Sequence, residues 1–423
     1  MAKVFLPKGT RDLMPEQMNR RLMVINTVRE VFARYGFDPL ETPAFERIET
    51  LTGKYGDEGE KLMFRILKRG AGGTNGEVDL ALRYDLTVPL ARVMAMNPGT
   101  PLPFKRSQIQ PVWRADRPQR GRFREFYQCD VDTVGTDSPV ADAECIAVVH
   151  DALTALGFTD FVIRVNHRQV LRALAVAIGA EDRETSMLQG IDKIDKIGRA
   201  GVENELVERG FTVDQVHRLW GYLDGEEIPG AAPYEADLNT IVGLATSMGV
   251  DPAKVRIERT LARGLDYYTG PVFETVLAGD YSGSISGGGR YDGLIGMFSG
   301  KGDVPAVGVS LGIERIFMLM EEMGLVAAAR TATQVWATVF SDDTRSATLA
   351  AATALRSAGV RVQVSTRVGK LGKQFKDAAS KGVPFALVCG PDEAAAGTAV
   401  LKNLETGEQH SGTPEELVQH LRG

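Results

Sequence analysis

Cysteine and histidine are scarce in this chain, and their scatter argues against the sites that these residues usually build. Only three cysteines occur in 423 residues, Cys129, Cys145 and Cys389, and none belongs to the close pairs typical of a zinc site or a disulfide framework. The five histidines show no HExxH or similar ligand spacing. We therefore expect no metal ion held by the protein's own side chains.

Long apolar runs are also missing. No segment is apolar for long enough to span a membrane, and the N-terminal MAKVFLPKGTRD lacks the apolar core of a secretory signal. We therefore expect a cytoplasmic protein with no membrane partner. The 43% hydrophobic and 25% charged residues are typical of a globular protein. A chain of this length predicts about two to four domains.

Positive charge is not in excess, since the formal net charge is −6. A general polyanion binder would carry a surplus of Lys and Arg, so any contact with nucleic acid must be local. Residues 331–423 hold ten Lys and Arg against nine Asp and Glu, and the rest of the chain carries the acidity. This asymmetry points weakly to the C-terminal part as the nucleic-acid contact.

The familiar nucleotide-binding loops are absent. No GxxxxGK[ST] sequence occurs, and GAGGTN, which begins at Gly70, departs from GxGxxG at its last position. If the chain binds ATP, the phosphates must therefore be held by dispersed arginines.

Hydrophobic periodicity predicts a helix first and then a sheet. Apolar residues recur at helical spacing from Met18 through Leu22, Ile25, Val28 and Phe32, and Gly36 supplies a stop. Strand-like runs follow at 63–67 and 78–84, around the turn GAGGTNGE, and continue to Gly157. These runs predict an antiparallel sheet flanked by helices.

The pattern then changes twice. Short helical patterns replace strands between about 170 and 245, which predicts an inserted helical unit, and strand-like runs return at 255–277. From about residue 334, strands alternate with helices, which indicates a separate α/β unit. Its lysines Lys370, Lys373 and Lys376 recur along one predicted helix face, suited to RNA but equally to a solvated surface.

An arginine-rich turn offers the first candidate for chemistry. The segment WRADRPQRGRFREF, residues 113–126, holds five arginines between strand-like flanks. Guanidinium groups bind phosphate oxygens in bidentate fashion, and an aromatic ring can stack on a base. A nucleotide site is one interpretation, although a solvated hairpin is the commoner explanation of such a loop alone.

Other polar clusters admit two interpretations as well. Asp85 and Thr87 could grip an ammonium group or form a surface ion pair and a helix cap. Gln128, Asp130 and Asp132 alternate along a predicted strand and share one face, which could line a pocket or be the wet face of a sheet. RGLDYYTG, SGGGRYDG and GIER likewise fit both a site and ordinary structure.

Taken in order, these segments resemble histidyl-tRNA synthetases over essentially the whole chain. Pro43 resembles the proline of class II motif one, which lies at a dimer interface in that family. Residues 114–126 resemble motif two, and GIER at 312–315 resembles motif three. RGLDYYTG and SGGGRYDG resemble the two histidine-specific signature peptides, and IDKIDKIG resembles part of the helical insertion.

The resemblance implies an α+β fold: a class II antiparallel sheet flanked by helices, with a helical insertion and a C-terminal α/β anticodon-binding domain. The implied parts are residues 1–170 and 249–326 for the catalytic domain, 171–248 for the insertion and 327–423 for the anticodon-binding domain.

The resemblance also implies a role for each matching residue. The ATP-binding positions would be Arg114, Asp116, Arg122, Phe126 and Arg315. Phe126 would stack on adenine, and Arg114 and Arg315 would hold phosphates. Arg263 would act at the α-phosphate beside Arg114. The histidine ammonium would meet Asp85, Thr87 and Gln128, and the imidazole would meet Asp132 and Tyr268, with Tyr267 alongside. Arg117 and Gln119 would approach the tRNA.

Two positions depart from the usual family pattern. Asp116 and Asp132 stand where glutamate is more common, although the carboxylate chemistry is kept. RYDLT replaces the RPEGT common in bacterial relatives and matches a subfamily variant.

The implied activity is a histidine–tRNA ligase that uses ATP with Mg²⁺, joins histidine to tRNA(His), and forms a homodimer. Three alternatives differ in class. A catalytically inactive regulatory paralogue lacks the C-terminal unit and the Arg263 position. Another class II synthetase lacks the histidine-specific peptides. An RNA-binding module would bind tRNA without ATP.

Overall fold

The computed structural model describes residues 4–54, 56–262, 267–278, 283–300, 302–325 and 331–421, with the backbone alone at 56–58. The chain folds into two compact units. One comprises Met1–Arg11 with Val24–Leu325, and the other comprises Asp12–Met23 with Val326–Gly423.

The first helix forms where the periodicity predicts it. Helix α1 spans Pro15–Arg34, and Gly36 follows with a φ of 74° that favours glycine. Its buried side chains include Val24, Val28 and Phe32, whereas Leu22 is 42% exposed. The predicted helix is therefore confirmed, but Leu22 lies outside its buried stripe.

An eight-stranded sheet organises the larger unit, in the order β1-β5-β6-β11-β10-β9-β7-β8. The two outermost pairs, β1 with β5 and β7 with β8, are parallel, and the five pairs between them are antiparallel. The strands are β1 (Asp38–Pro39), β5 (Phe104–Trp113), β6 (Glu125–Val134), β7 (Phe161–His167), β8 (Val255–Ile257), β9 (Pro271–Leu277), β10 (Ser286–Arg290) and β11 (Ala306–Gly312).

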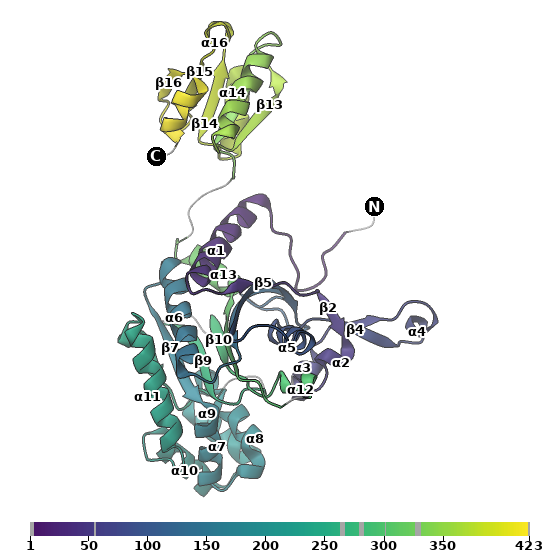
Figure 1. Cartoon of the computed structure of the whole chain (residues 1–423), viewed down its shortest axis with the longest axis vertical. Coiled ribbons are helices and arrows are strands. Elements are labelled where there is room, and N and C mark those ends of the chain that lie inside the picture. Colours follow the sequence, from purple (N-terminus) through teal and green to yellow (C-terminus); the bar gives the residue numbers. More distant parts are fainter. Residues whose placement is uncertain are drawn as a thin grey trace. The chain divides into compact units, whose positions relative to one another are not determined.

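Helices α6 (Pro139–Ala155) and α11 (Ala232–Ser247) lie over one face of this sheet, and α13 (Ile313–Glu322) continues directly from β11 (Figure 1). Arg290 on β10 pairs with Asp142 on α6 through two contacts of 2.6 and 3.1 Å. Because side chains alternate along a strand, the neighbours of Arg290 in sequence face the other side of the sheet. That opposite face carries the site.

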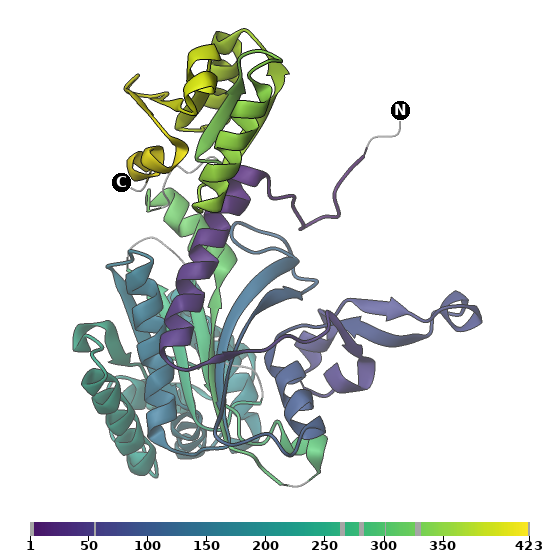
Figure 2. The same ribbon diagram turned by 45° about the horizontal axis from the view of Figure 1, so that its top comes forward.

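A small sheet, β2-β4-β3, flanks the large one. It projects from the rest of this unit in both views (Figure 1, Figure 2). Its elements are β2 (Phe45–Arg47), α2 (Ile48–Leu51), α3 (Gly56–Lys61), β3 (Arg65–Leu67), α4 (Ala71–Thr74) and β4 (Val78–Leu82), with α5 (Thr87–Met96) and α12 (Gly296–Ser299) beside it. The predicted hairpin around GAGGTNGE is confirmed, and one short helical turn sits at its tip.

The inserted helical region lies between two neighbouring strands. The chain leaves the sheet at β7 and returns in β8, where Ile163 pairs with Val255. The connecting elements are α7 (Arg168–Ala177), η1 (Glu181–Arg183), α8 (Glu184–Ile191), α9 (Ile194–Glu208), α10 (Val213–Leu223), α11 and η2 (Pro252–Lys254). Leu174, Ile191, Leu206 and Leu219 belong to one buried apolar cluster within it.

The C-terminal unit is built on a five-stranded sheet in the order β13-β12-β14-β15-β16. Its elements are β12 (Val335–Val339), α14 (Arg345–Ser357), β13 (Val362–Val368), α15 (Leu371–Ser380), β14 (Phe385–Cys389), α16 (Pro391–Ala396), β15 (Ala399–Asn403), β16 (Gln409–Gly412), α17 (Pro414–Leu417) and η3 (Val418–Leu421). The predicted alternation is confirmed, but Lys370 precedes α15 and adopts a left-handed conformation with a φ of 46°. The mixed α+β class is confirmed as well.

Candidate active site

Three rows of polar side chains cross the open face of the large sheet. Strand register aligns each β6 residue with one on β5 and one on β11. The rows are Gln110–Gln128–Gly312, Gln108–Asp130–Ser310 and Arg106–Asp132–Gly308. The β6 and β11 members of these rows form the floor of a cavity of about 250 Å³. The predicted sharing of one face by Gln128, Asp130 and Asp132 is confirmed, and the face lines a pocket.

Arg106 is the buried cation beneath this floor. It has no exposed surface, and its guanidinium lies 2.8 Å from Asp132 Oδ2 and 3.9 Å from Asp130 Oδ2. It also donates to Gln108 Oε1 at 3.1 Å and to the Leu86 carbonyl at 3.3 Å. Two neighbouring carboxyls therefore face one fully buried positive charge.

The two carboxyls on β6 differ in their hydrogen bonds. Asp132 Oδ1 accepts from the Tyr291 hydroxyl, and its Oδ2 faces Arg106. Asp130 Oδ1 has no hydrogen-bond partner among the described residues. Burial raises the pKa of Asp130 to about 7, against the lowering effect of Arg106. Burial also raises the pKa of Asp132, although Arg106 and Tyr291 favour its ionised form.

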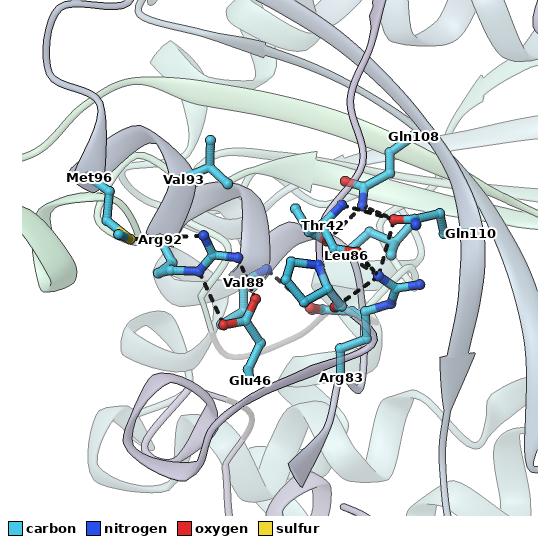
Figure 3. Close-up of polar contacts among 12 residues, drawn as sticks. Thr42, Glu46, Arg83, Leu86, Val88, Arg92, Val93, Met96, Gln108 and Gln110 are labelled. Atoms are coloured by element: carbon cyan, nitrogen blue, oxygen red, sulfur yellow. Dashed lines mark hydrogen bonds and ion pairs between the residues drawn. The ribbon is translucent and has the colours of Figure 1, made fainter. Parts of the chain in front are cut away.

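Gln108 ties the pocket floor to the chain around Pro43. Its amide donates to Thr42 Oγ1 at 2.8 Å and to Gln110 Oε1 at 2.6 Å. Arg83, only 1% exposed, donates to Gln110 Oε1 and to the carbonyls of Thr42 and Pro43 (Figure 3). A continuous set of hydrogen bonds thus joins this loop to Arg106.

Asp85 caps a helix and faces the cavity, but it is too buried for the surface ion pair that the sequence also allowed. Its Oδ1 accepts from the Val88 backbone N–H at 3.0 Å at the start of α5, and its Oδ2 accepts from the Tyr267 hydroxyl at 3.3 Å. Asp85 and Thr87 also line the cavity. One carboxylate therefore stabilises a helix start and faces the site.

The tyrosines of both signature peptides meet over the β6 carboxyls. The Tyr267 ring lies edge-on to Tyr268 at 5.0 Å and to Tyr291 at 5.9 Å between centroids. All three line the cavity. Burial raises the pKa of Tyr268 and of Tyr291, with Asp132 adding to both shifts. These hydroxyls therefore stay protonated and can donate hydrogen bonds at neutral pH.

Glycines keep the end of the pocket open. A Cβ on Gly308 would lie 2.0 Å from Asp132 Oδ1, and a Cβ on Gly288 would lie 2.1 Å from the Gly308 carbonyl oxygen. Gly308 excludes any side chain while Asp132 keeps its place, and Gly288 excludes one while the backbone of β11 keeps its place. The glycines of SGGGRYDG therefore have a steric role, whereas its Arg290 faces away and anchors α6.

The other end of the cavity is formed by the arginine-rich hairpin. Arg114 donates to the Tyr84 carbonyl at 3.0 Å, and its guanidinium lies 4.3 Å from the Tyr84 ring and 5.3 Å from the Phe126 ring. Arg114 and Phe126 line the cavity beside Gln128. A fixed cation and an aromatic face are thus adjacent to the carboxyl-lined pocket.

The remaining predicted nucleotide and tRNA residues lie outside the cavity lining. Arg315 donates to the Ser284 carbonyl, and Ser284 does line the cavity. Asp116 is buried and pairs with the half-exposed Arg122 at 2.9 Å. Arg117 and Gln119 are exposed near the hairpin turn, which an isolated bridge from Gln119 to Arg122 closes. Arg263 lies outside the described residues.

Reasoning from the sequence gave no role to Asp130, Tyr291 and Ser310, which line the cavity, or to Arg106, which lies beneath it. The alternating polar residues of KRSQIQ, next to the arginine-rich turn, were the available signal for Arg106. Asp130 was seen on the right face but was given no role.

Metal-binding clusters and membrane spans are both missing from the described residues. They include no group of three or more His, Cys, Asp or Glu side chains that could hold a metal ion. Within the same ranges, no helix has the length and hydropathy to cross a membrane.

Comparison with known proteins identifies similar chains. A family model described as "Histidyl-tRNA synthetase" matches residues 9–316, and one described as "Anticodon binding domain" matches 334–423. A histidine–tRNA ligase of Cytophaga hutchinsonii is 43% identical over 453 residues, covering 100% of both chains. Another, from Gloeobacter violaceus, is 44% identical over 442 residues, covering 95% of this chain and 94% of its own.

A solved structure is similar to this chain over its whole length as well. The crystal structure of a histidyl-tRNA synthetase from Nostoc sp. PCC 7120 superimposes with a TM-score of 0.86 at 31% identity and covers 100% of both chains. The similarity therefore extends over the sheet, the insertion and the C-terminal unit.

Proposed function

The chain belongs to the histidyl-tRNA synthetase family, and from this premise we propose how its pocket performs the reaction. It is a histidine–tRNA ligase: it activates histidine with ATP and transfers the amino acid to tRNA. The match of the anticodon-binding model to 334–423 also fits a synthetase better than the regulatory paralogue considered above.

The observation that supports the pocket assignment best is one shared cavity. Tyr268, Gly288, Arg114 and Phe126 line it together, so the signature peptides adjoin the hairpin that resembles motif two. Histidine would occupy the carboxyl-lined end, with its ammonium on Asp85, Thr87 and Gln128. Asp132 and Tyr268 would bond the imidazole nitrogens, with Tyr267 alongside. A site that bonds a polar side chain on both sides can reject analogues by about 10⁴-fold.

ATP would occupy the arginine end. Phe126 would stack on adenine, Arg114 and Arg315 would hold phosphates, and the Asp116–Arg122 pair would complete the binding surface. The histidine carboxylate attacks the α-phosphorus, forming a carboxyl–phosphate bond while pyrophosphate leaves. Arg263 would stabilise charge at the α-phosphate, and Mg²⁺ would accompany the phosphates of ATP. Positioning and charge neutralisation then account for catalysis, since the substrate supplies the nucleophile.

In the second step, a terminal ribose hydroxyl of tRNA attacks the adenylate carbonyl and AMP leaves. A phosphate oxygen would accept the hydroxyl proton. Arg117 and Gln119, both exposed on the hairpin, would approach the end of the tRNA acceptor stem. The C-terminal unit would read the anticodon through lysines that are exposed on and just before α15.

The larger organisation follows the same premise. We assign the catalytic domain to residues 1–170 and 249–326, the helical insertion to 171–248 and the anticodon-binding domain to 327–423. A homodimer that uses the Pro43 region is proposed from the motif one resemblance. The cytoplasm, where ATP, histidine and tRNA occur together, is the proposed location.

One assay tests the function: ATP–pyrophosphate exchange with each of the twenty amino acids. Exchange with histidine alone is expected. Exchange with a different amino acid would select another class II synthetase, and none would select the regulator or the RNA binder.

The Arg263→Ala variant tests the role of that residue. It should lose most exchange activity, by about 10²-fold or more, while its thermal unfolding stays near that of the unmodified enzyme. Undiminished exchange would remove Arg263 from the mechanism.

A further inference from the structure

The middle row of the pocket floor contains a carboxyl that no assignment above uses. Asp130 lies between Gln128 and Asp132 on β6, lines the cavity and is only 2% exposed. Its Oδ1 has no hydrogen-bond partner in the described part of the chain. A buried acceptor without a donor is costly, so its retention next to a ligand cavity points to a donor that arrives with the ligand.

Arg106 does not supply that donor. Its nearest nitrogen is 3.9 Å from Asp130 Oδ2, beyond a hydrogen bond, whereas the same nitrogen is 2.8 Å from Asp132 Oδ2. Asp132 also accepts from Tyr291. The cation and the tyrosine thus serve mainly Asp132. A hydrogen bond with Ser310 favours the ionised form of Asp130, and Asp130 Oδ1 remains without a partner among the described residues.

We propose that Asp130 binds the substrate directly, its Oδ1 accepting an N–H of histidine, and that it contributes to the selection of this amino acid. This inference rests on the proposed function. The donor is either the ammonium group or the imidazole ring, because Asp130 lies in the row between Gln128 and Asp132.

The electrostatics of the pocket support the same role. Burial raises the pKa of Asp130 to about 7, and the charged or titratable groups around it are Arg106, Asp132, Asp85, Tyr268 and Tyr291. A cationic substrate binds more tightly to the ionised carboxylate. The KM for histidine should therefore fall as pH rises from about 6 to 8, in addition to the change caused by titration of the substrate itself.

The test compares Asp130→Asn with Thr133→Val by histidine-dependent ATP–pyrophosphate exchange between pH 6 and 8. Thr133 is a matched control because it is buried on the same strand, faces the other side of the sheet, and has no partner for its hydroxyl among the described residues. Asp130→Asn should raise the KM for histidine by about 10- to 100-fold, change kcat much less, and flatten the pH dependence. Thr133→Val should match the unmodified enzyme.

Inhibition by two analogues identifies the donor. If Asp130 bonds the ammonium group, the amide variant weakens binding of histidinol but not of imidazolelactate, which lacks that group. If it bonds the ring, binding of both analogues weakens. Either result supports the proposal.

An Asp130→Asn KM within about twofold of that of Thr133→Val, with an unchanged pH profile, would overturn it. If the amide variant does not fold, as judged by thermal unfolding, Asp130→Ser makes the same comparison with a smaller side chain. Absence of histidine-dependent exchange in the unmodified enzyme would instead refute the proposed function.

Discussion

The pocket floor is a place where one added methyl group has a large effect. Because a Cβ on Gly308 would lie 2.0 Å from Asp132 Oδ1, Gly308→Ala should displace that carboxylate from Arg106 and Tyr291. We expect the KM for histidine to rise at least about tenfold and stability to fall by about 1–3 kcal/mol. Exchange kinetics and urea unfolding measure the two effects.

Gly243→Ala is the control for this substitution, because nothing lies within 4 Å of a Cβ at that position of α11. It should leave exchange unchanged and stabilise the helix slightly. A Gly308→Ala enzyme with normal kinetics would contradict the steric role given to this glycine.

Asp130 also makes stability depend on pH in a direction opposite to most carboxylates. Its pKa is about 7 in the folded protein against 3.8 for an ordinary aspartate. Its contribution to the free energy of unfolding is therefore fully present below about pH 4 and lost as pH rises through 7. Relative to the unmodified protein, Asp130→Asn should gain stability between pH 5 and 8.

Urea unfolding at pH 5 and pH 8 measures this gain, with Thr133→Val expected to follow the unmodified protein at both values. Parallel pH dependences of Asp130→Asn and the unmodified protein would show that the carboxyl titrates normally.

The limits of sequence reasoning are clearest at single residues. Alternation along β6 was enough to place Gln128, Asp130 and Asp132 on one face. The same alternation could place Arg106 on one face of β5 but could not predict its burial, because an arginine in a strand is usually solvated and its burial depends on which strands become neighbours. The register of β5 against β6, which aligns Arg106 with Asp132, is set by long-range pairing.

At the level of elements, one buried ion pair joins β10 to the helix behind it. Arg290→Met would leave Asp142 unpaired in a buried place, where the two contacts are now 2.6 and 3.1 Å. We expect a loss of about 3–5 kcal/mol in the free energy of unfolding. Residual folded protein should keep the KM for histidine, since Arg290 faces away from the pocket.

Arg256→Met on β8 provides the comparison, because that arginine is 57% exposed and pairs only with Glu258 among the described residues. It should cost less than about 1 kcal/mol. Equal losses for the two variants would contradict the anchoring role.

At the level of elements, long periodic segments were predicted, whereas one short polar strand was missed. Helix α1 and the hairpin around GAGGTNGE formed where periodicity and turn residues placed them. Strand β16, which reads QHSG, was missed because it is short, polar and lies at a sheet edge, where no apolar alternation is required.

At the scale of the whole molecule, we expect histidine activation to depend on the larger unit, and the C-terminal unit to affect only the transfer of histidine to tRNA. Lys373 and Lys376 are exposed on α15 of the C-terminal unit. Replacing both by glutamine should lower kcat/KM for tRNA in aminoacylation and reduce its dependence on salt, since fewer phosphates are neutralised. Histidine-dependent pyrophosphate exchange should be unchanged.

Glu405→Gln, which neutralises an exposed carboxylate in the same unit, should alter neither assay. A loss of exchange in the double lysine variant, or no loss of aminoacylation, would contradict this division.

The helical insertion connects two neighbouring strands at one edge of the sheet. Because β7 and β8 are parallel, the chain leaves the end of β7 and crosses back along the sheet to enter β8, and the helices between contribute an apolar cluster of their own. Such a segment can lengthen, shrink or be exchanged during evolution without changing the register of any strand that bears Arg106, Asp130 or Asp132. The entropy cost of closing such a connection grows only slowly with its length. The insertion is thus the part of this catalytic unit most open to acquiring new properties while the pocket stays the same.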